Sequence, residues 1–426
     1  MKVLVISHNS FSTYLSMGKT LCSLFSAFKK ESLCQLYIYP SLPDVDCCNS
    51  CYRITDKNIL NFFRTLKVEG KEIKFESKYK TFHKLFENPK DEVLYRNKKN
   101  HSAIRVLARD VLWFIVPWFN KSLKIWLLNE KITHIFVAPG DSKFIYDIAL
   151  KCSKFLNVPI ITYLCDEYFF VAQPKGLLKK IKVFLQRRKM VQLLKKTSLI
   201  VTISEELKNL YEPFFKIKTK VLYTATSFPI SQKPLPRFSI NELTYMGNIR
   251  LNRFKSLCDI GEILDDINQE YQTNFTLKIY SPEKDKTILS SLSKHQSIKL
   301  MNFVTGDQFK NTFYSTQCFL HVEAFDECTI DYIKNSISTK IADCLGSGIL
   351  LAAYGPSSIA SMKHLIRNNC ALVADNKKEL KNMLLKIFNM TEKERSAIIK
   401  NALATANKCH KADVNGLELL NTISIV

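Results

Sequence analysis

The feature that most constrains the fold of this chain is a regular alternation of short apolar runs with helix-like segments. The apolar runs lie at 2–7, 35–40, 133–139, 158–164, 199–204 and 219–225, and, after the Pro- and Ser-rich segment 226–239, at 242–247, 275–281, 298–304, 317–323, 349–355 and 370–375. Alternating strands and helices form parallel sheets with helices on both faces. We therefore predict an α/β protein with two Rossmann-like domains facing one cleft, an N-terminal domain over 1–228 and a C-terminal domain over 240–405.

Length and composition restrict the class of protein further. The 426 residues suffice for two or three domains, and a hydrophobic content of 46% excludes a disordered chain. The 13 cysteines have no even spacing, which indicates reduced thiols in a cytosol. We interpret 48-CNSC-51 as a loop with free thiols rather than a zinc site, because no second ligand pair lies nearby. No apolar run is long enough to span a bilayer, and the opening run is interpreted as a buried strand rather than an export signal.

The charge of the chain indicates an anionic partner. The net charge is +23, yet the sequence has no nucleic-acid-binding motif, so a membrane surface is favoured over nucleic acid. Between Lys175 and Lys196 there are nine Lys or Arg and no acid. The apolar residues within this segment, and the tryptophans that precede it, are Leu177, Ile181, Phe184, Val191 and Leu194, and Trp113, Trp118 and Trp126. Both segments are either one membrane-facing surface or ordinary helices with one packed and one solvated face.

A lysine occupies an unusual position in 338-STKIADCLGSGILLAAYGP-356. Ser338 is a good N-cap, Gly346 and Gly348 are stop signals, and an apolar run follows, so a helix of about ten residues leading into a buried strand is predicted. Lys340 then lies in the first turn, where a cation opposes the helix dipole at a cost of about 0.3–1 kcal/mol. The pattern therefore predicts an anion beside Lys340.

Polar residues follow several of the predicted strands, where the ligands of parallel α/β sheets bind. His8 and Asn9 follow the first run, and Asp166 follows the run at 158–164. His8 is either a structural histidine or part of a polar rim. The segment 18-GKT-20 lacks the first glycine of a phosphate-binding loop, so Gly18 is expected to let a helix approach a neighbouring segment closely. We interpret 44-DVD-46 as a solvated turn rather than a metal site.

Several of these segments together resemble a known family. They are 1-MKVLVISHN-9, 17-MGKTL-21, 52-YRITD-56, 245-YMGNIRLNRFKSL-257 and 338-STKIADCLGSG-348 with 354-YGP-356. Spread over nearly the whole chain, they resemble the GT-B glycosyltransferases, and most closely family 4 (glycosyl transferases group 1), whose bacterial members build capsular or cell-wall polysaccharides. The resemblance implies transfer of a hexose from a nucleotide sugar to a lipid-linked glycan or oligosaccharide acceptor. It also implies a retaining enzyme without metal or other cofactor, peripheral at the inner face of the membrane, whose final helical segment, 406–426, returns to the first domain.

The resemblance also implies roles for residues of the second domain. The diphosphate would meet Lys340, Arg253 and Lys255 together with backbone N–H groups near Ser338 and Thr339. Asp343 would hold the ribose hydroxyls, or else only offset the charge of Lys340 on the helix surface. Asn335 replaces the first acid of the family signature and would orient the donor sugar without a charge. Tyr280, Phe303 and Val304 would surround the nucleobase, or else Phe303 and Val304 are plain core residues. Uridine is the expected nucleoside, and guanosine is the alternative.

On the acceptor side, the resemblance points to Asn9, Gly18 and Asp166. Asp166 would be the base or would orient a hydroxyl, or else it is a helix N-cap. Two alternatives to a glycosyltransferase stay open. One is an epimerase of nucleotide sugars, and the other, suggested by Asn335, is a non-catalytic nucleotide- or glycan-binding protein with a decayed site.

Overall fold

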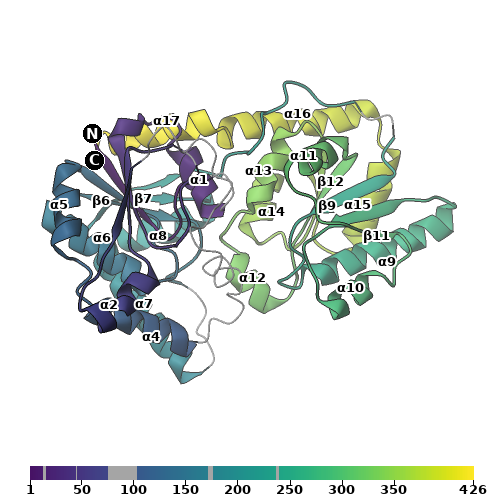
Figure 1. Ribbon diagram of the computed structural model, residues 1–426. Coiled ribbons are helices and arrows are strands. Elements are labelled where there is room, and N and C mark those ends of the chain that lie inside the picture. The colour runs from purple at the N-terminus through teal and green to yellow at the C-terminus, as the bar shows by residue number, and fades with distance from the viewer. Residues whose placement is uncertain (13–15, 45, 75–102, 171–175, 237–238) are drawn as a thin grey trace. The chain divides into compact units, whose positions relative to one another are not determined.

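The chain folds around two β-sheets, one of which is parallel apart from one edge strand and one fully parallel (Figure 1). The computed structural model describes residues 1–426 except 13–15, 45, 75–102, 171–175 and 237–238. An N-terminal unit comprises Met1–Tyr223 together with Ala412–Val426, and a C-terminal unit comprises Thr224–Lys411. The predicted α/β class with two sheets is confirmed.

The N-terminal unit contains an eight-stranded sheet with the order β4-β3-β2-β1-β5-β6-β7-β8. All neighbouring strands are parallel except β3 and β4, which are antiparallel. The strands are β1 (Val3–Ser7), β2 (Leu33–Tyr37), β3 (Ser50–Arg53), β4 (Lys71–Lys74), β5 (His134–Val137), β6 (Ile160–Leu164), β7 (Thr197–Thr202) and β8 (Thr219–Val221). The helices are α1 (Ser16–Leu24), η1 (Lys30–Ser32), α2 (Asp56–Thr65), α4 (Ala103–Ile115), α5 (Lys121–Asn129), α6 (Lys143–Leu156), α7 (Leu177–Leu194), α8 (Glu205–Phe215) and α17 (Ala412–Ile423).

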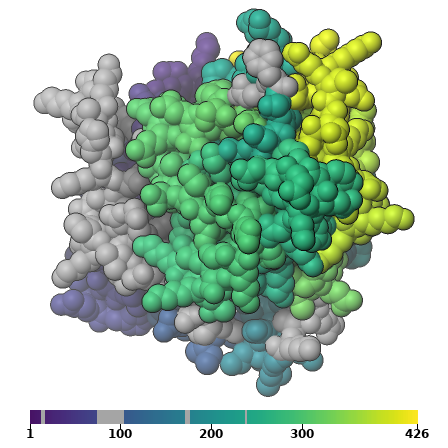
Figure 2. Space-filling model, turned by 90° about the vertical axis from the view of Figure 1, so that its right-hand side faces the viewer, coloured from purple at the N-terminus to yellow at the C-terminus, as the bar shows by residue number. Residues whose placement is uncertain are grey.

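The C-terminal unit contains a fully parallel six-stranded sheet with the order β11-β10-β9-β12-β13-β14. Its strands are β9 (Glu242–Met246), β10 (Thr276–Tyr280), β11 (Ile298–Met301), β12 (Cys318–Val322), β13 (Leu350–Tyr354) and β14 (Leu372–Ala374). Its helices are α9 (Arg253–Tyr271), α10 (Lys286–Leu292), α11 (Gly306–Ser315), α12 (Glu327–Ile333), α13 (Thr339–Gly346), α14 (Ala360–Arg367), α15 (Lys377–Asn389) and α16 (Glu392–Cys409). Figure 2 shows a face of this unit, with green segments over most of it and the yellow end of the chain along one edge.

The first strand shows how the N-terminal unit divides its core between two layers. Side chains alternate between the two faces of a strand. Leu4 and Ile6 belong to a cluster that includes side chains of α4, α5, α6 and α7, whereas Val3 and Val5 belong to a cluster with side chains of α1 and α17. All five residues of β1 are buried, as expected for a central parallel strand covered on both faces.

Helix α17 belongs to the N-terminal unit, where it packs against α1. Leu419 and Ile423 are fully buried there. Gly416 permits the close approach, because a Cβ atom at this position would lie 2.5 Å from Ser26 Oγ and 2.9 Å from the backbone nitrogen of Ala27. The last helix therefore completes a layer that the first helix begins.

Two sequence interpretations need correction. The segment 48-CNSC-51 is only partly a loop, because Ser50–Arg53 is strand β3, paired with β2. The thiols of Cys48 and Cys51 are free, as predicted, and are buried with their sulfur atoms 3.4 Å apart. The tryptophans do not form a surface for a membrane. Trp113, Trp118 and Trp126 are all buried, and their indole N–H groups donate to Asp56 Oδ1, the Trp113 carbonyl and Ser50 Oγ, respectively.

Among the described helices, none is both long and apolar enough to cross a bilayer. The described residues also contain no group of three His, Cys, Asp or Glu side chains placed to hold a metal ion.

Candidate functional site

A pocket of about 220 Å³ lies at the carboxyl ends of the central strands of the C-terminal sheet. Strands β9 and β12 are neighbours there although β10 and β11 lie between them in sequence, so the strand order reverses at this point. Open parallel sheets bind their ligands at such a switch point. The pocket is lined by Met246, Gly247, Tyr280, Phe303, Val304, Phe309, Phe313, Phe319, Leu320, His321, Lys340, Ile341, Asp343 and Cys344.

Lys340 reaches the pocket from the first turn of α13 and lies across Tyr245. Its Nζ is 4.7 Å from the centre of the Tyr245 ring and donates to the Tyr245 hydroxyl at 3.3 Å. The Tyr245 hydroxyl donates its own proton to the Asn248 carbonyl at 2.7 Å. Among the residues that the structure describes, no carboxylate forms an ion pair with Lys340. Within the described part of the chain, Lys340 therefore has aromatic and hydroxyl contacts but no counter-ion.

Gly247 makes room for this lysine. Its φ of +144° is rarely adopted by residues with a side chain, and a Cβ atom here would lie 2.5 Å from Lys340 Nζ. The turn after β9 therefore needs glycine for both its backbone conformation and the passage of the lysine side chain.

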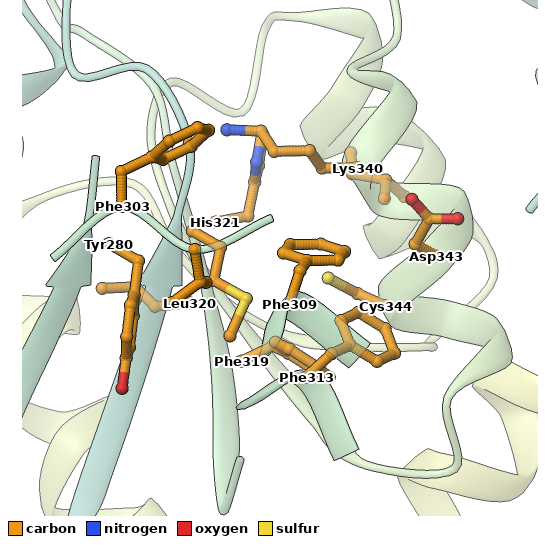
Figure 3. Close-up of a pocket in the computed structure, with 14 residues that line it drawn as sticks. Tyr280, Phe303, Phe309, Phe313, Phe319, Leu320, His321, Lys340, Asp343 and Cys344 are labelled. Carbon is orange, nitrogen blue, oxygen red and sulfur yellow. The ribbon is translucent and has the colours of Figure 1, made fainter. Parts of the chain in front are cut away.

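His321 belongs to strand β12, and its side chain lies next to that of Lys340 (Figure 3). Its side chain is buried, and its Nε2 forms no hydrogen bond with any described residue, although the carboxylate oxygen Glu323 Oε1 lies 3.4 Å away. Burial, and then the charges of Lys340 and Arg253, lower the pKa of His321 well below its ordinary value. A buried polar atom without a partner costs about 1–3 kcal/mol. A polar atom of a bound ligand would satisfy this nitrogen.

Arg253 pairs with Glu323 and does not line the pocket. Arg253 begins α9, and its Nε and one terminal nitrogen donate to the two Glu323 oxygens at 2.7 and 3.2 Å. Ser256 Oγ donates to the Glu323 carbonyl at 2.8 Å. This ion pair satisfies the guanidinium of Arg253 locally, whereas no described carboxylate pairs with Lys340.

Asp343 lines the pocket one turn after Lys340 and already accepts two hydrogen bonds. Its Oδ1 receives the Ser227 backbone N–H at 2.6 Å and the Thr226 hydroxyl at 3.1 Å. In Figure 3 the carboxylate of Asp343 and the ammonium of Lys340 lie at different ends of the pocket.

The structure brings together part of the predicted donor set. Tyr280, Phe303, Val304, Lys340 and Asp343 line one pocket. The other residues of the predicted donor set, which are not on its wall, are Arg253, Lys255, Asn335, Ser338 and Thr339.

The positions of these outer residues have local causes. Lys255 and Thr339 are exposed, and Asn335 lies in the turn between α12 and α13. Ser338 is the N-cap of α13, but its side chain makes no capping hydrogen bond. Its backbone N–H donates to Ser361 Oγ at 3.1 Å.

The acceptor-side candidates lie in the N-terminal unit. Asn9 follows β1, and its carbonyl accepts from Ser7 Oγ at 2.7 Å and Gln35 Nε2 at 3.0 Å. The close approach expected at Gly18 is present, because a Cβ atom there would lie 2.6 Å from the Ser10 carbonyl oxygen.

The loop after β6 contains one exposed and one buried acid. Asp166 is exposed and accepts from the Tyr168 hydroxyl at 3.3 Å. Glu167 is buried and accepts from the backbone N–H groups of Phe169 and Phe170, both at 2.7 Å, and from the Tyr211 hydroxyl at 2.8 Å. Glu167 thus fixes the loop that presents Asp166.

Sequence reasoning missed His321, Gly247 and Tyr245. His321 interrupts the apolar run 317–323, and a histidine inside a predicted buried strand near its carboxyl end was a usable signal. The contacts of Gly247 and Tyr245 with Lys340 join positions far apart in sequence, so no local pattern reports them.

Comparison with known proteins adds solved structures only. No protein-family model matches the chain, and no curated protein matches it in sequence. Anabaena Alr3699/HepE in complex with UDP matches over the whole of both chains with a TM-score of 0.63 and 11% identity. The UDP-forming α,α-trehalose-phosphate synthase of Burkholderia vietnamiensis matches over the whole of both chains with a TM-score of 0.58 and 12% identity. Sucrose-phosphate synthase of Thermosynechococcus elongatus matches over 100% of this chain and 98% of its own, with a TM-score of 0.59 and 10% identity.

At such low identities, the likeness establishes the fold. The chain has the GT-B fold, with two α/β domains built on parallel sheets.

Proposed function

We propose that this chain is a glycosyltransferase that moves a hexose from a UDP-sugar to a glycan acceptor. The observation that carries the proposal is Lys340, which lies at the start of α13 beside a pocket at the sheet's switch point and forms no ion pair with any residue that the structure describes. Among the similar structures, HepE was solved with UDP and with UDP-glucose, and the trehalose-phosphate synthase is described as UDP-forming. These matches support a nucleotide diphosphate as the anion.

The chemistry of the pocket suits a sugar nucleotide. A diphosphate leaving group gains negative charge in the transition state, and a fixed ammonium with the first N–H groups of a helix stabilises that charge without a metal. The aromatic wall, formed by Phe309, Phe313 and Phe319, offers a surface to a planar base, as do Tyr280 and Phe303. In this proposal Asp343 holds the ribose, and Arg253, Lys255, Ser338 and Thr339 support the diphosphate from outside the pocket wall.

The acceptor in this proposal is a lipid-linked glycan of cell-surface polysaccharide synthesis. Asp166 would act as the base or orient the attacking hydroxyl, since it is exposed after a strand of the N-terminal sheet. Asn9 and Gly18 would shape the acceptor side, and Asn335 would contact the donor sugar during retaining transfer. The location in this proposal is the cytoplasmic face of the membrane.

Replacement of Lys340 tests the proposal. Lys340→Met keeps much of the side-chain volume but removes the charge, and we expect UDP binding to weaken by about 1.5–3 kcal/mol, the contribution of a charged hydrogen bond. Turnover of UDP-sugars should fall at least in proportion. Lys378→Met is the matched control, because Lys378 is an exposed lysine of α15 in the same unit.

Isothermal titration with UDP and an assay of sugar transfer or UDP-sugar hydrolysis separate the outcomes. Unchanged UDP affinity in folded Lys340→Met would refute the donor site. UDP binding by the wild-type chain, without transfer or hydrolysis of any nucleotide sugar, would instead favour a non-catalytic nucleotide-binding protein.

A further inference from the structure

Helix α4 of the N-terminal unit leaves a stripe of apolar side chains exposed. Ile104, Val111 and Ile115 are separated by seven and four residues, so they share one face of the helix, and all three are more than half exposed. Phe114 extends this stripe and is 70% exposed. The opposite side of α4 faces the core with the buried Trp113.

Helix α7 contacts α4 and carries a second apolar stripe. Leu177, Ile181 and Phe184 follow one another at helical spacing, and Leu177 and Phe184 are 73% and 64% exposed. The core-facing residues Met190 and Leu193 are buried on the other side of the helix. We refer to Ile104, Val111, Phe114 and Ile115 of α4 with Leu177, Leu178, Ile181 and Phe184 of α7 as the α4–α7 surface.

Basic residues continue the exposed face of α7. Arg188 and Lys195 lie seven and eighteen residues after Ile181 and Leu177, respectively, so they project from the same side of the helix as the apolar stripe. Both are exposed, and neither forms an ion pair with a described residue. Helix α7 contains no acidic residue that could neutralise them.

Two other lysines of α7 form ion pairs within the N-terminal unit. Lys182 pairs with Asp141 at 3.2 Å, and Lys189 pairs with Asp147 at 2.5 Å. These pairs attach the helix to its own unit. Arg188 and Lys195 are therefore available to a partner on the outward face, next to exposed leucine, isoleucine and phenylalanine side chains.

This combination has a specific physical complement. Large apolar side chains beside unpaired cations fit the boundary between the headgroups and the acyl chains of an anionic bilayer. Nucleic acid would match the cations but would leave the aliphatic side chains in water. We propose that the α4–α7 surface docks this chain on an anionic lipid surface, with Phe114 and Phe184 inserted among the lipids and Arg188 and Lys195 at the phosphates. The proposal stands apart from the donor site and would bring a transferase to a lipid-linked acceptor.

Sedimentation of the full chain with lipid vesicles tests the proposal. Two vesicle types are needed, one of phosphatidylcholine alone and one of equal parts phosphatidylcholine and phosphatidylglycerol. We expect binding to the anionic vesicles only, and a decline as salt rises, since charges are screened over about 10 Å at 0.1 M salt. The paired change Phe114→Ser and Phe184→Ser should weaken binding about tenfold, because the two phenylalanine side chains of the wild type transfer from water into the lipid and serine does not. Arg188→Glu with Lys195→Glu should abolish it at moderate salt.

Ile366→Ser with Lys378→Glu is the matched control, because both residues are exposed in the C-terminal unit. This control should sediment as the wild type does, and UDP binding by every variant reports that the donor unit is intact. Absence of sedimentation with anionic vesicles would overturn the proposal. Full binding by the serine pair would also overturn it, since charge alone would then explain the attachment, as would preferential binding of single-stranded RNA through the same cations.

Discussion

His321 remains neutral between two cations, and this gives it a use that a charged residue would lack. Because its pKa is held well below the ordinary value by burial, Lys340 and Arg253, it can exchange a hydrogen bond with a ligand without adding charge. His321→Leu should weaken binding of a UDP-sugar by about 0.5–1.5 kcal/mol. The same change should leave the free protein as stable or more stable, since it removes a buried polar atom without a partner.

Titration of the UDP-sugar and thermal unfolding of His321→Leu measure these two effects. His321→Asn, which keeps a hydrogen-bonding group, should recover part of the affinity. Loss of stability together with unchanged affinity would indicate a purely structural histidine.

Gly247 offers a test of the position of Lys340 that leaves the lysine itself unchanged. In Gly247→Ala the new methyl group would lie 2.5 Å from Lys340 Nζ, so the ammonium must move, and we expect UDP affinity to fall about as far as in Lys340→Met. Gly306→Ala is the matched control, because Gly306 also has a positive φ, +57°, but nothing within 4 Å of the added carbon. Both variants should lose about 1 kcal/mol or more of stability from backbone strain.

Titration calorimetry with UDP distinguishes the two glycine variants. Equal UDP affinity in Gly247→Ala and Gly306→Ala would mean that the position of Lys340 does not matter for the donor.

The candidate site could be predicted from sequence where a local rule was broken. Lys340 was predicted as a site residue because a cation in a first helical turn is unfavourable on its own. Arg253 belonged to the same expectation, but its ion pair with Glu323 joins α9 to the end of β12, and no sequence spacing reports that contact. The role of Asn335 depends on the conformation of the turn between α12 and α13, and the sequence pattern of the two helices does not specify that conformation.

Helices α14 and α16 are linked by a buried histidine pair that makes stability depend on pH. His364 Nε2 lies 3.0 Å from His410 Nε2, and His410 Nδ1 lies 2.7 Å from the Thr224 carbonyl oxygen. Burial, followed by His410 and Arg367, lowers the pKa of His364 to about 3. Burial lowers the pKa of His410 to about 4, partly opposed by the bond to Thr224.

The sign of the pH effect follows from these pKa values. Below pH 6.5 the unfolded chain takes up protons on both histidines while the folded chain does not, so the free energy of unfolding falls as pH falls. Each histidine should remove up to about 2 kcal/mol at pH 5 relative to pH 7. Urea unfolding at both pH values measures the loss. His364→Gln should reduce the pH dependence, because it removes one of the two buried histidines with a lowered pKa.

Some strands and helix faces could be predicted from the sequence and others could not. The long Val- and Ile-rich runs predicted most of both sheets, because strands buried on both faces are continuously apolar. Strands β3 and β4 were not predicted, because their sequences SCYR and KEIK are short and polar. Their extended conformation depends on pairing, of β3 with β2 and of β4 with β3. The exposed apolar stripe of α4 was not predicted either. An apolar residue has the same sequence signal whether it faces a core or a membrane, and here the tryptophans face the core.

At the scale of the whole molecule, the proposed transfer reaction is expected to proceed without a divalent metal. In the proposed mechanism Lys340 and the start of α13 supply the positive charge that the leaving diphosphate requires. Transfer or hydrolysis of a UDP-sugar should therefore proceed at an unchanged rate in excess EDTA, with Mg²⁺ added back as the control. A strict requirement for Mn²⁺ or Mg²⁺ would contradict this mechanism.

The return of α17 to α1 sets an order of events during synthesis. Residues 1–223 leave the ribosome first, but the apolar face that Leu419 and Ile423 cover stays open until Thr224–Lys411 has been translated. At about 5–20 residues per second this interval lasts roughly 10 to 40 s. The C-terminal unit, an uninterrupted segment, can finish folding within that time. The half of the protein that is made first is therefore the last to be closed, and its exposed layer is where a nascent-chain chaperone would be needed.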